Sequence, residues 1–217
     1  MFRKAVAMAA FGSIVTGCST ASPTMYQALT SASQLQPNPQ DKSGRIPYQY
    51  KAPVNWRQYD KIIVEPVVIY RGPDNQFVKI EENEKAELAD DMATQFKQKL
   101  GSRFRIIGTR GPGTLRLRLT LTGAKKTSPV LGPLSRIDVG GGVYNTVQAI
   151  RDQEGAMTGS VSYAVEIHDA ESDTLLYAYV TKQYPGAMNI GATFSSLEAS
   201  KVGIGKGADA LLADIGR

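Results

Sequence analysis

Residues 114–122 read TLRLRLTLT, a stretch in which leucine alternates with threonine or arginine at every position. Successive side chains of a β-strand point to opposite faces, so a period of two is typical of a strand with one buried face. The buried face would carry four leucines, namely Leu115, Leu117, Leu119 and Leu121. The sequence therefore predicts a half-buried strand, with Arg116 and Arg118 on a solvated face.

Four other segments also have strand patterns. Residues 60–70 (DKIIVEPVVIY) are β-branched and nearly all apolar, which is typical of a central strand, and Pro66 predicts a bulge or an edge position. Residues 103–107 predict a short strand. Residues 160–168 (SVSYAVEIH) alternate, and residues 174–184 (TLLYAYVTKQY) follow after an aspartate-rich turn. We expect these last two segments to form a hairpin.

Two segments have the apolar period of a helix. Over residues 83–100 a large apolar side chain recurs every fourth residue, and Asn83 and Gly101 are the expected N-cap and C-terminal stop. A second helix, beginning with a serine, is expected over residues 195–215. Three glycines within it predict either a close approach to the sheet or a break, and we expect one kinked helix. They are Gly203, Gly205 and Gly207.

These elements follow one another as β-α-β-β, a long excursion, and then β-β-α. An amphipathic helix buries one stripe, so both helices are expected on one face of the sheet. The first strand–helix–strand unit should cross over right-handed and join two parallel strands. We therefore expect an α+β (α/β) two-layer sandwich with a mixed sheet of about five strands, in a single domain over residues 48–217.

Residues 123–159 form the least regular part of this expected domain. Lys125-Lys126 is followed by prolines and then by Gly140-Gly141-Gly142. A connection of this length inside a compact domain is uncommon and tends to be functional or mobile. A contact with a partner and a disordered excursion both remain open for this segment.

The first residues have the pattern of an export signal. A positive start at Arg3 and Lys4 precedes an apolar run over residues 5–15, which has roughly half the length that a membrane span needs. The run leads into Val15-Thr16-Gly17-Cys18, in which an aliphatic residue, a small residue and a glycine precede the only cysteine. We expect residues 1–17 to be a lipoprotein signal peptide.

Cleavage at that point would make Cys18 the first residue, with acyl chains on its sulfur and amine. Residues 18–47 are rich in Ser, Thr, Gln and Pro, and we expect a lipidated N-terminus and a flexible tether there. The apolar residues 25–29 leave a second interpretation open, in which a Tyr-Leu pair docks onto the domain. Several acyl chains would anchor the protein stably in a membrane.

The net charge and the cysteine content limit the classes of function and the ways in which the fold can be stabilised. The formal net charge of +5 includes Arg3 and Lys4 of the leader, and the remainder is too small to indicate nucleic-acid binding. With Cys18 acylated no thiol is left for a disulfide, so a mature chain of about 200 residues must be held by packing alone.

Candidate chemistry centres on His168, the only histidine. Glu166 lies on the same strand face and Asp169 follows, so a metal site can be drawn. A usable site needs three or four ligands, and a solvent-facing pair is the stronger interpretation. The chain has no G-x-S-x-G nucleophile motif. We therefore expect no enzyme activity, no metal and no cofactor.

Three further candidates have simpler structural interpretations. The glycines of residues 108–113 precede a strand, whereas a phosphate-binding loop needs a helix N-terminus. Trp56 belongs to an aromatic lead-in that should cover the core, with ligand stacking as the alternative. Acidic residues gather at the start of the first helix without the spacing of a calcium loop, so we expect a solvated face. They are Glu81, Glu82, Glu84, Glu87, Asp90 and Asp91.

Several of these features occur together in one known family. The features are the Cys18 motif, the aromatic residues Tyr48, Tyr50, Trp56 and Tyr59, the segment YDKIIVEPV at residues 59–67, Gly159 before its alternating strand, and the Asp169-Ala170 turn. In these respects the chain resembles the family of small proteobacterial lipoproteins catalogued as domain of unknown function thirty-three thirteen. The glycines of the last helix depart from that family, whose last helix is rich in Ala, Trp and Leu.

The resemblance implies an outer-membrane lipoprotein, and it implies no particular chemical reaction. Ser19, rather than an aspartate, follows the cysteine, which favours the periplasmic face of the outer membrane. We expect a non-enzymatic binding or accessory module whose partner is an envelope protein or peptidoglycan. A subunit of an envelope secretion or export assembly is the alternative, and a metal-dependent envelope hydrolase is a weaker one.

Overall fold

A computed structural model describes residues 22–127, 159–185 and 196–217. Within these ranges the strands are β1 (Gln36–Pro37), β2 (Tyr48–Lys51), β3 (Lys61–Val64), β4 (Val68–Ile69), β5 (Gln76–Val78), β6 (Arg105–Ile106), β7 (Thr114–Lys125), β8 (Ser160–Asp169) and β9 (Leu175–Gln183). The helices are α1 (Glu82–Leu100), α3 (Glu198–Ile215) and the 3₁₀ turn η1 (Trp56–Gln58).

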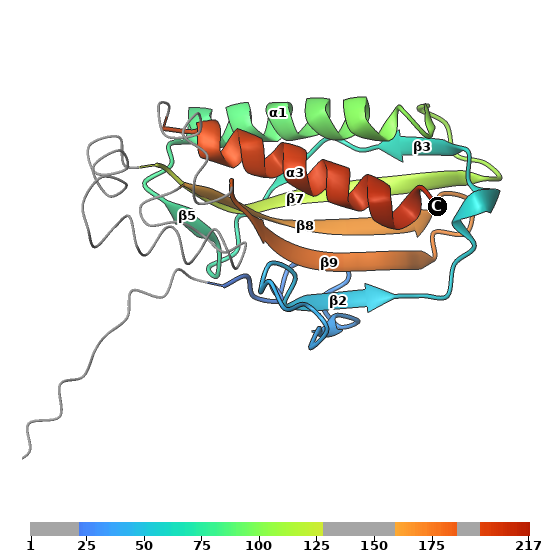
Figure 1. Cartoon of the computed structure of the whole chain (residues 1–217), viewed down its shortest axis with the longest axis horizontal. Coiled ribbons are helices and arrows are strands. Elements are labelled where there is room, and N and C mark those ends of the chain that lie inside the picture. Colours follow the sequence, from blue (N-terminus) through green and yellow to red (C-terminus); the bar gives the residue numbers. More distant parts are fainter. Residues whose placement is uncertain (1–21, 128–158, 186–195) are drawn as a thin grey trace, which may run out of the picture.

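All nine described strands belong to one mixed sheet, with the order β1-β2-β9-β8-β7-β3-β6. The long strand β7 pairs antiparallel with β8 on one side and parallel with β3, β4 and β5 on the other. The parallel pairing of β3 with β6 across α1 and the β8–β9 hairpin are confirmed. Figure 1 shows α1 and α3 side by side over the sheet, so the expected two-layer α+β architecture is also confirmed.

The predicted irregularity at Pro66 is a bulge between β3 and β4. Val64 lies opposite Leu117 and Val68 lies opposite Thr120. Between these two pairs the β3–β4 segment therefore contains one residue more than β7. Proline has no backbone N–H to donate to a neighbouring strand, and the bulge leaves Pro66 without a pairing partner on β7. The segment then resumes its pairing with β7.

The main core lies between the sheet and the two helices. The four leucines of β7 have no exposed surface, and the apolar stripe of α1 packs against them through Leu88, Met92, Phe96 and Leu100. The helix begins one residue earlier than predicted, and Asn83 is not its N-cap. Glu81 occupies that position, and its backbone N–H donates to the Glu84 carboxylate at 2.8 Å. Gly101 ends the helix in a right-handed conformation.

Helix α3 continues without interruption through its glycines. A Cβ at Gly203 would lie 2.9 Å from the backbone oxygen of Gln183, and a Cβ at Gly207 would overlap the Tyr163 hydroxyl. Close approach of the helix to β8 and β9, which was one of the two interpretations, therefore explains both glycines, and the break does not occur.

The opposite face of the sheet is partly covered by the N-terminal segment, residues 22–47, which the expected two-layer arrangement did not include. Tyr26, Leu29 and Leu35 are buried against it, where they pack with apolar residues of β8 and β9. The expected flexible tether is therefore wrong for residues 22–47, and the docked Tyr-Leu pair is confirmed. Residues 18–21, including Cys18, lie outside the described part of the chain.

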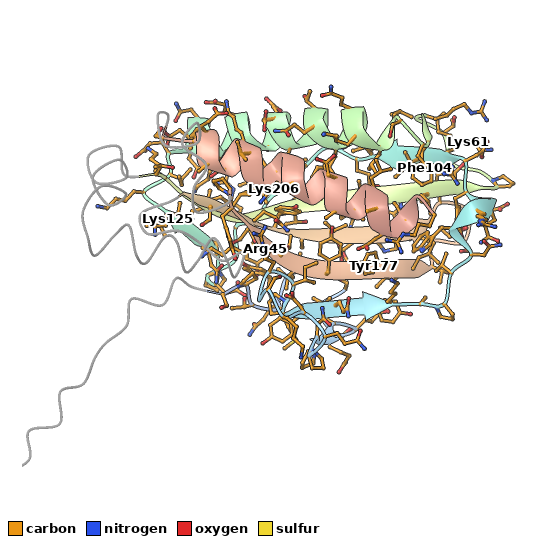
Figure 2. All side chains as sticks on the ribbon, in the orientation of Figure 1. Arg45, Lys61, Phe104, Lys125, Tyr177 and Lys206 are labelled. Carbon is orange, nitrogen blue, oxygen red and sulfur yellow. The ribbon has the colours of Figure 1, made fainter. Side chains whose placement is uncertain are left out.

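The C-terminal part of this N-terminal segment is also held in place. β2 pairs antiparallel with β9 beyond the hairpin, and β1 pairs with β2 as the outermost strand on that side. The Arg45 guanidinium lies 4.3 Å from the centre of the Tyr184 ring and donates to the Gln183 side chain at 3.1 Å. Figure 2 shows Arg45 beside this end of β9. The segment thus contacts the sheet along most of its length.

The irregular region is shorter than predicted, because residues 123–125 continue β7 and pair with both β5 and β8. The part of the expected partner contact over residues 128–158 lies outside the described ranges. Among the helices that are described, none has the length and apolar composition needed to cross a bilayer.

Candidate functional site

The polar face of β7 and β8 lies beneath the N-terminal segment. Arg116 is in register with His168, and Arg118 with Glu166. The residues expected to be solvated are largely buried: Arg116, Glu166 and His168 expose 4%, 1% and 6% of their surface. The predicted solvated arginine face is thus wrong for Arg116, and the predicted solvent-facing Glu166–His168 pair is wrong for both residues. Glu166 is covered by the N-terminal segment through Ser31, and Arg116 lies between Glu65 and Asp173.

An ion-pair network runs across this face. Glu65, which follows β3, accepts from Arg116 Nη1 at 3.0 Å and from Arg118 Nε at 3.1 Å. Arg116 also pairs with Asp173 in the β8–β9 turn, and Arg118 Nη1 donates to the Thr30 hydroxyl at 2.9 Å. Burial alone would raise the pKa of Glu65, but the two guanidinium groups outweigh it and hold that pKa below its usual value.

Glu166 and His168 have different surroundings within this network. One carboxylate oxygen of Glu166 accepts from the Ser31 backbone N–H at 2.7 Å, which ties the N-terminal segment to β8. The His168 Nδ1 atom is buried and has no hydrogen-bond partner among the described residues. Burial, assisted by the nearby Arg116, lowers the pKa of His168 below its ordinary value, so the ring is neutral at pH 7.

The three residues considered for a metal do not converge. The Asp169 carboxylate accepts from the backbone N–H groups of Glu171 and Ser172 and from the Tyr59 hydroxyl, so it closes the β8–β9 turn. In the described ranges no group of three or more His, Cys, Asp or Glu side chains is placed to hold a metal ion.

A pocket of about 780 Å³ opens beside the network. One wall is the N-terminal segment, the other is the chain from Glu65 to Gly72, and the floor belongs to β7 and β8. The residues that line it include polar ones, such as Glu65, Arg71, Arg118 and Thr30, and apolar ones, such as Leu29, Val68 and Ile69. The pocket therefore offers both charge signs next to apolar surface. Such a lining suits an amphipathic ligand with hydrogen-bonding groups.

Sequence patterns did not indicate this pocket, because its walls come from segments that are far apart in the chain. The docked Tyr-Leu pair was the available signal, since it predicts that residues 25–29 cover part of the sheet.

The remaining candidates have structural roles. Trp56 is buried in the main core beside Tyr59, which leaves no free ring face for a ligand. Most acidic residues of α1 are exposed or form ion pairs, with Glu82 beside Arg71 and Lys85, Glu84 beside Lys126, and Glu87 beside Lys201. Asp91 is half-buried and accepts from the Gln95 side chain at 2.6 Å. Residues 108–113 connect β6 to β7, as expected for a turn.

Fold and site together define a single α+β domain whose sheet carries two helices on one face and an ordered N-terminal segment with a charged, open pocket on the other. The chain belongs to the family described as Protein of unknown function (DUF3313), whose family model matches residues 25–211. This match confirms the resemblance, and it includes the docked segment.

Solved structures that match this chain include proteins from two bacteria. A variant PelC dodecamer and a second PelC dodecamer, both from Paraburkholderia phytofirmans, share 12% and 13% identity with TM-scores of 0.41 and 0.39, and each match covers 77% of this chain and 94% of the other. A Xanthomonas campestris protein of the family DUF330 shares 6% identity with a TM-score of 0.36 and covers 76% and 87%. These similarities are too low to assign a function. Comparison with curated proteins found no match.

Proposed function

We propose that this protein is a lipid-anchored outer-membrane lipoprotein, facing the periplasm, that acts as a non-enzymatic binding module of the cell envelope. The anchoring is inferred from the motif Val15-Thr16-Gly17-Cys18, which ends an apolar run that follows the basic residues Arg3 and Lys4. Acyl chains on Cys18 would keep the domain at the membrane.

The pocket supports the binding part of the proposal. At the floor of the pocket, one carboxylate oxygen of Glu166 accepts from the Ser31 backbone N–H. At its side, the Arg118 side chain is one-third exposed. Glu166 is only 1% exposed, so the accessible polar group is the Arg118 guanidinium, which a carboxylate or carbonyl on a partner can approach. Peptidoglycan stem peptides and protein segments both carry such groups beside apolar side chains. An envelope protein or peptidoglycan is therefore the proposed partner class.

The anchoring is tested by feeding cells an alkyne-tagged palmitate analogue. The wild-type chain should incorporate the label and fractionate with the outer membrane, whereas Cys18→Ala should remain an unlabelled precursor. A wild-type chain that keeps residues 1–17 or carries a free thiol at Cys18 would contradict the anchoring.

The binding is tested with a photo-crosslinking amino acid placed at the pocket rim in intact cells. Val68 is a suitable position because 48% of it is exposed, and Ile106 is a matched control because 40% of it is exposed on β6, away from the pocket. We expect a crosslinked envelope component at position 68 that is absent at position 106. Identical adducts at both positions, or none at position 68, would argue against this binding surface.

A further inference from the structure

The folded body begins only a few residues after the proposed anchor. Ser22 is the first described residue, and its carbonyl oxygen accepts from the Gln76 side chain of β5 at 2.8 Å. Pro23 is buried, and the Tyr26 hydroxyl donates to the same Gln76 side chain at 2.9 Å. The chain is therefore fixed to β5 from Ser22 onward.

This attachment limits how far the body can stand from the membrane. An extended chain spans at most about 3.6 Å per residue, so the four steps from Cys18 to Ser22 reach roughly 14 Å. A lipid-anchored Cys18 lies at the bilayer surface. The end of the sheet that holds β5 must therefore lie close to the lipid headgroups.

The surface at this end carries exposed apolar side chains and lysines, next to the acidic first turn of α1. Met25 and Val78 are two of the four large apolar residues that are strongly exposed in the described ranges, with 43% and 51% of their surface accessible. Val78 is in register with Lys125, and Lys79 follows it. Lys79 and Lys125 have no ion-pair partner within the described part of the chain. Figure 2 shows Lys125 at the β5 end of the sheet.

We propose that the anchor-proximal end, defined as Met25, Val78, Lys79 and Lys125, rests on the lipid headgroups. The two apolar side chains enter the interface, and the two ammonium groups contact anionic headgroups. This proposal rests on the acylation of Cys18. It gives the domain one orientation, in which the pocket opens along the side of the body and β6 points away from the membrane.

The far end of the sheet supplies an internal control. β7 pairs with β5 at its C-terminal end and runs 12 residues back to Thr114, where β3 and β6 lie. At about 3.3 Å per residue the two ends are roughly 35 Å apart along the strand. Ile106 on β6 is exposed and apolar like Val78, but the proposal places it in water.

The test uses the full chain, processed in cells and reconstituted into vesicles of phosphatidylethanolamine and phosphatidylglycerol. Acylation blocks the only native thiol, so Val78→Cys and Ile106→Cys each provide one site for a nitroxide label. We expect a severalfold lower accessibility of the position-78 label to a water-soluble relaxation agent, and a severalfold higher accessibility to oxygen. The double substitution Lys79→Glu and Lys125→Glu should reduce the difference in accessibility between the labels at positions 78 and 106.

Equal accessibility at positions 78 and 106 in an acylated, membrane-bound protein would overturn the orientation. A protein that takes up no palmitate analogue would instead overturn the proposed anchoring, so the two failures are distinguishable. Matching circular dichroism spectra of the two labelled variants would exclude unfolding as the cause of a difference.

Discussion

Two arginines that are equivalent in the sequence pattern differ in burial. The Arg116 side chain is 5% exposed and pairs with two carboxylates, whereas the Arg118 side chain is 33% exposed. We expect Arg116→Ala to lower the free energy of unfolding by about 3–5 kcal/mol, because it leaves Glu65 partly buried with one of its partners removed. Arg118→Ala should cost about 1 kcal/mol or less. Urea unfolding of both variants checks this, and equal losses would contradict it.

His168 should make stability depend on pH near neutrality. Its pKa is lowered in the folded state, so just below pH 6.5 the unfolded chain binds a proton that the folded chain does not. The free energy of unfolding should fall as the pH falls through that window, and this contribution should level off below the folded-state pKa. Charged groups around the ring are Arg116, Arg118, Glu166 and Asp173.

The check is the urea midpoint of the wild type and of His168→Gln between pH 5 and pH 8. The variant should have a flatter profile over this range. The carboxylates with lowered pKa values, such as Glu65 and Asp173, lose their contribution only when the pH falls toward and below about 4.5, so the two windows separate. Parallel profiles for the two proteins would exclude His168 as the source.

At the level of single residues, the period of two correctly placed Arg116 and His168 on one face and the leucines on the other. It could not show that the polar face is buried, because the cover comes from a segment some 135 residues away along the chain, as in the Ser31–Glu166 hydrogen bond. Alternation reports which side chains share a face, and it does not report what lies on that face.

At the level of elements, the glycines of α3 provide a matched pair. Gly207→Ala would overlap the Tyr163 hydroxyl and should destabilise the protein by about 1–3 kcal/mol, the usual range for overpacking. Gly205→Ala meets only the flexible end of the Gln95 side chain and gains helix propensity, so it should be neutral or stabilising.

Thermal unfolding of both variants measures the difference. Adding Tyr163→Phe to Gly207→Ala should restore part of the loss, because it removes the overlapping oxygen, which has no hydrogen-bond partner among the described residues. A Gly207→Ala variant as stable as the wild type would show that the helix does not approach the sheet this closely.

The long elements could be predicted and the short ones could not. α1, β7 and the β8–β9 hairpin each have a periodic pattern long enough to identify from sequence. β1, β2 and β5 contain two to four residues. β2 and β5 exist because they pair with the distant strands β9 and β7, and β1 exists because it pairs with β2. The N-cap at Glu81 was also missed, because Asn83 is the better intrinsic cap and the Glu81–Glu84 contact depends on local geometry.

For the whole molecule, the N-terminal segment should behave as part of the core. Tyr26 is 1% exposed and its ring lies edge-on to Tyr70 at 5.4 Å. Tyr26→Ala should lower the free energy of unfolding by about 3–5 kcal/mol and expose residues 22–47 to protease. Met25→Ala, one residue earlier and largely exposed, is the control and should change stability by less than about 0.5 kcal/mol. Similar digestion patterns for both variants would contradict the docking.

The site followed from the sequence less completely than the fold did. Its components Glu166 and His168 were identified, but in the wrong environment, and the pocket was not foreseen. A site assembled by an ordered segment folding back over a sheet needs tertiary information that no local pattern contains.

The pairing of β2 with β9 also has a consequence for how the chain is made. Both strands must leave the ribosome before they can pair, and long-range pairing of this kind slows folding. The export that we propose for this chain would require it to cross a membrane channel while still unfolded. Because β2 can pair with β9 only after β9 has been synthesised, this side of the sheet would be completed after that crossing.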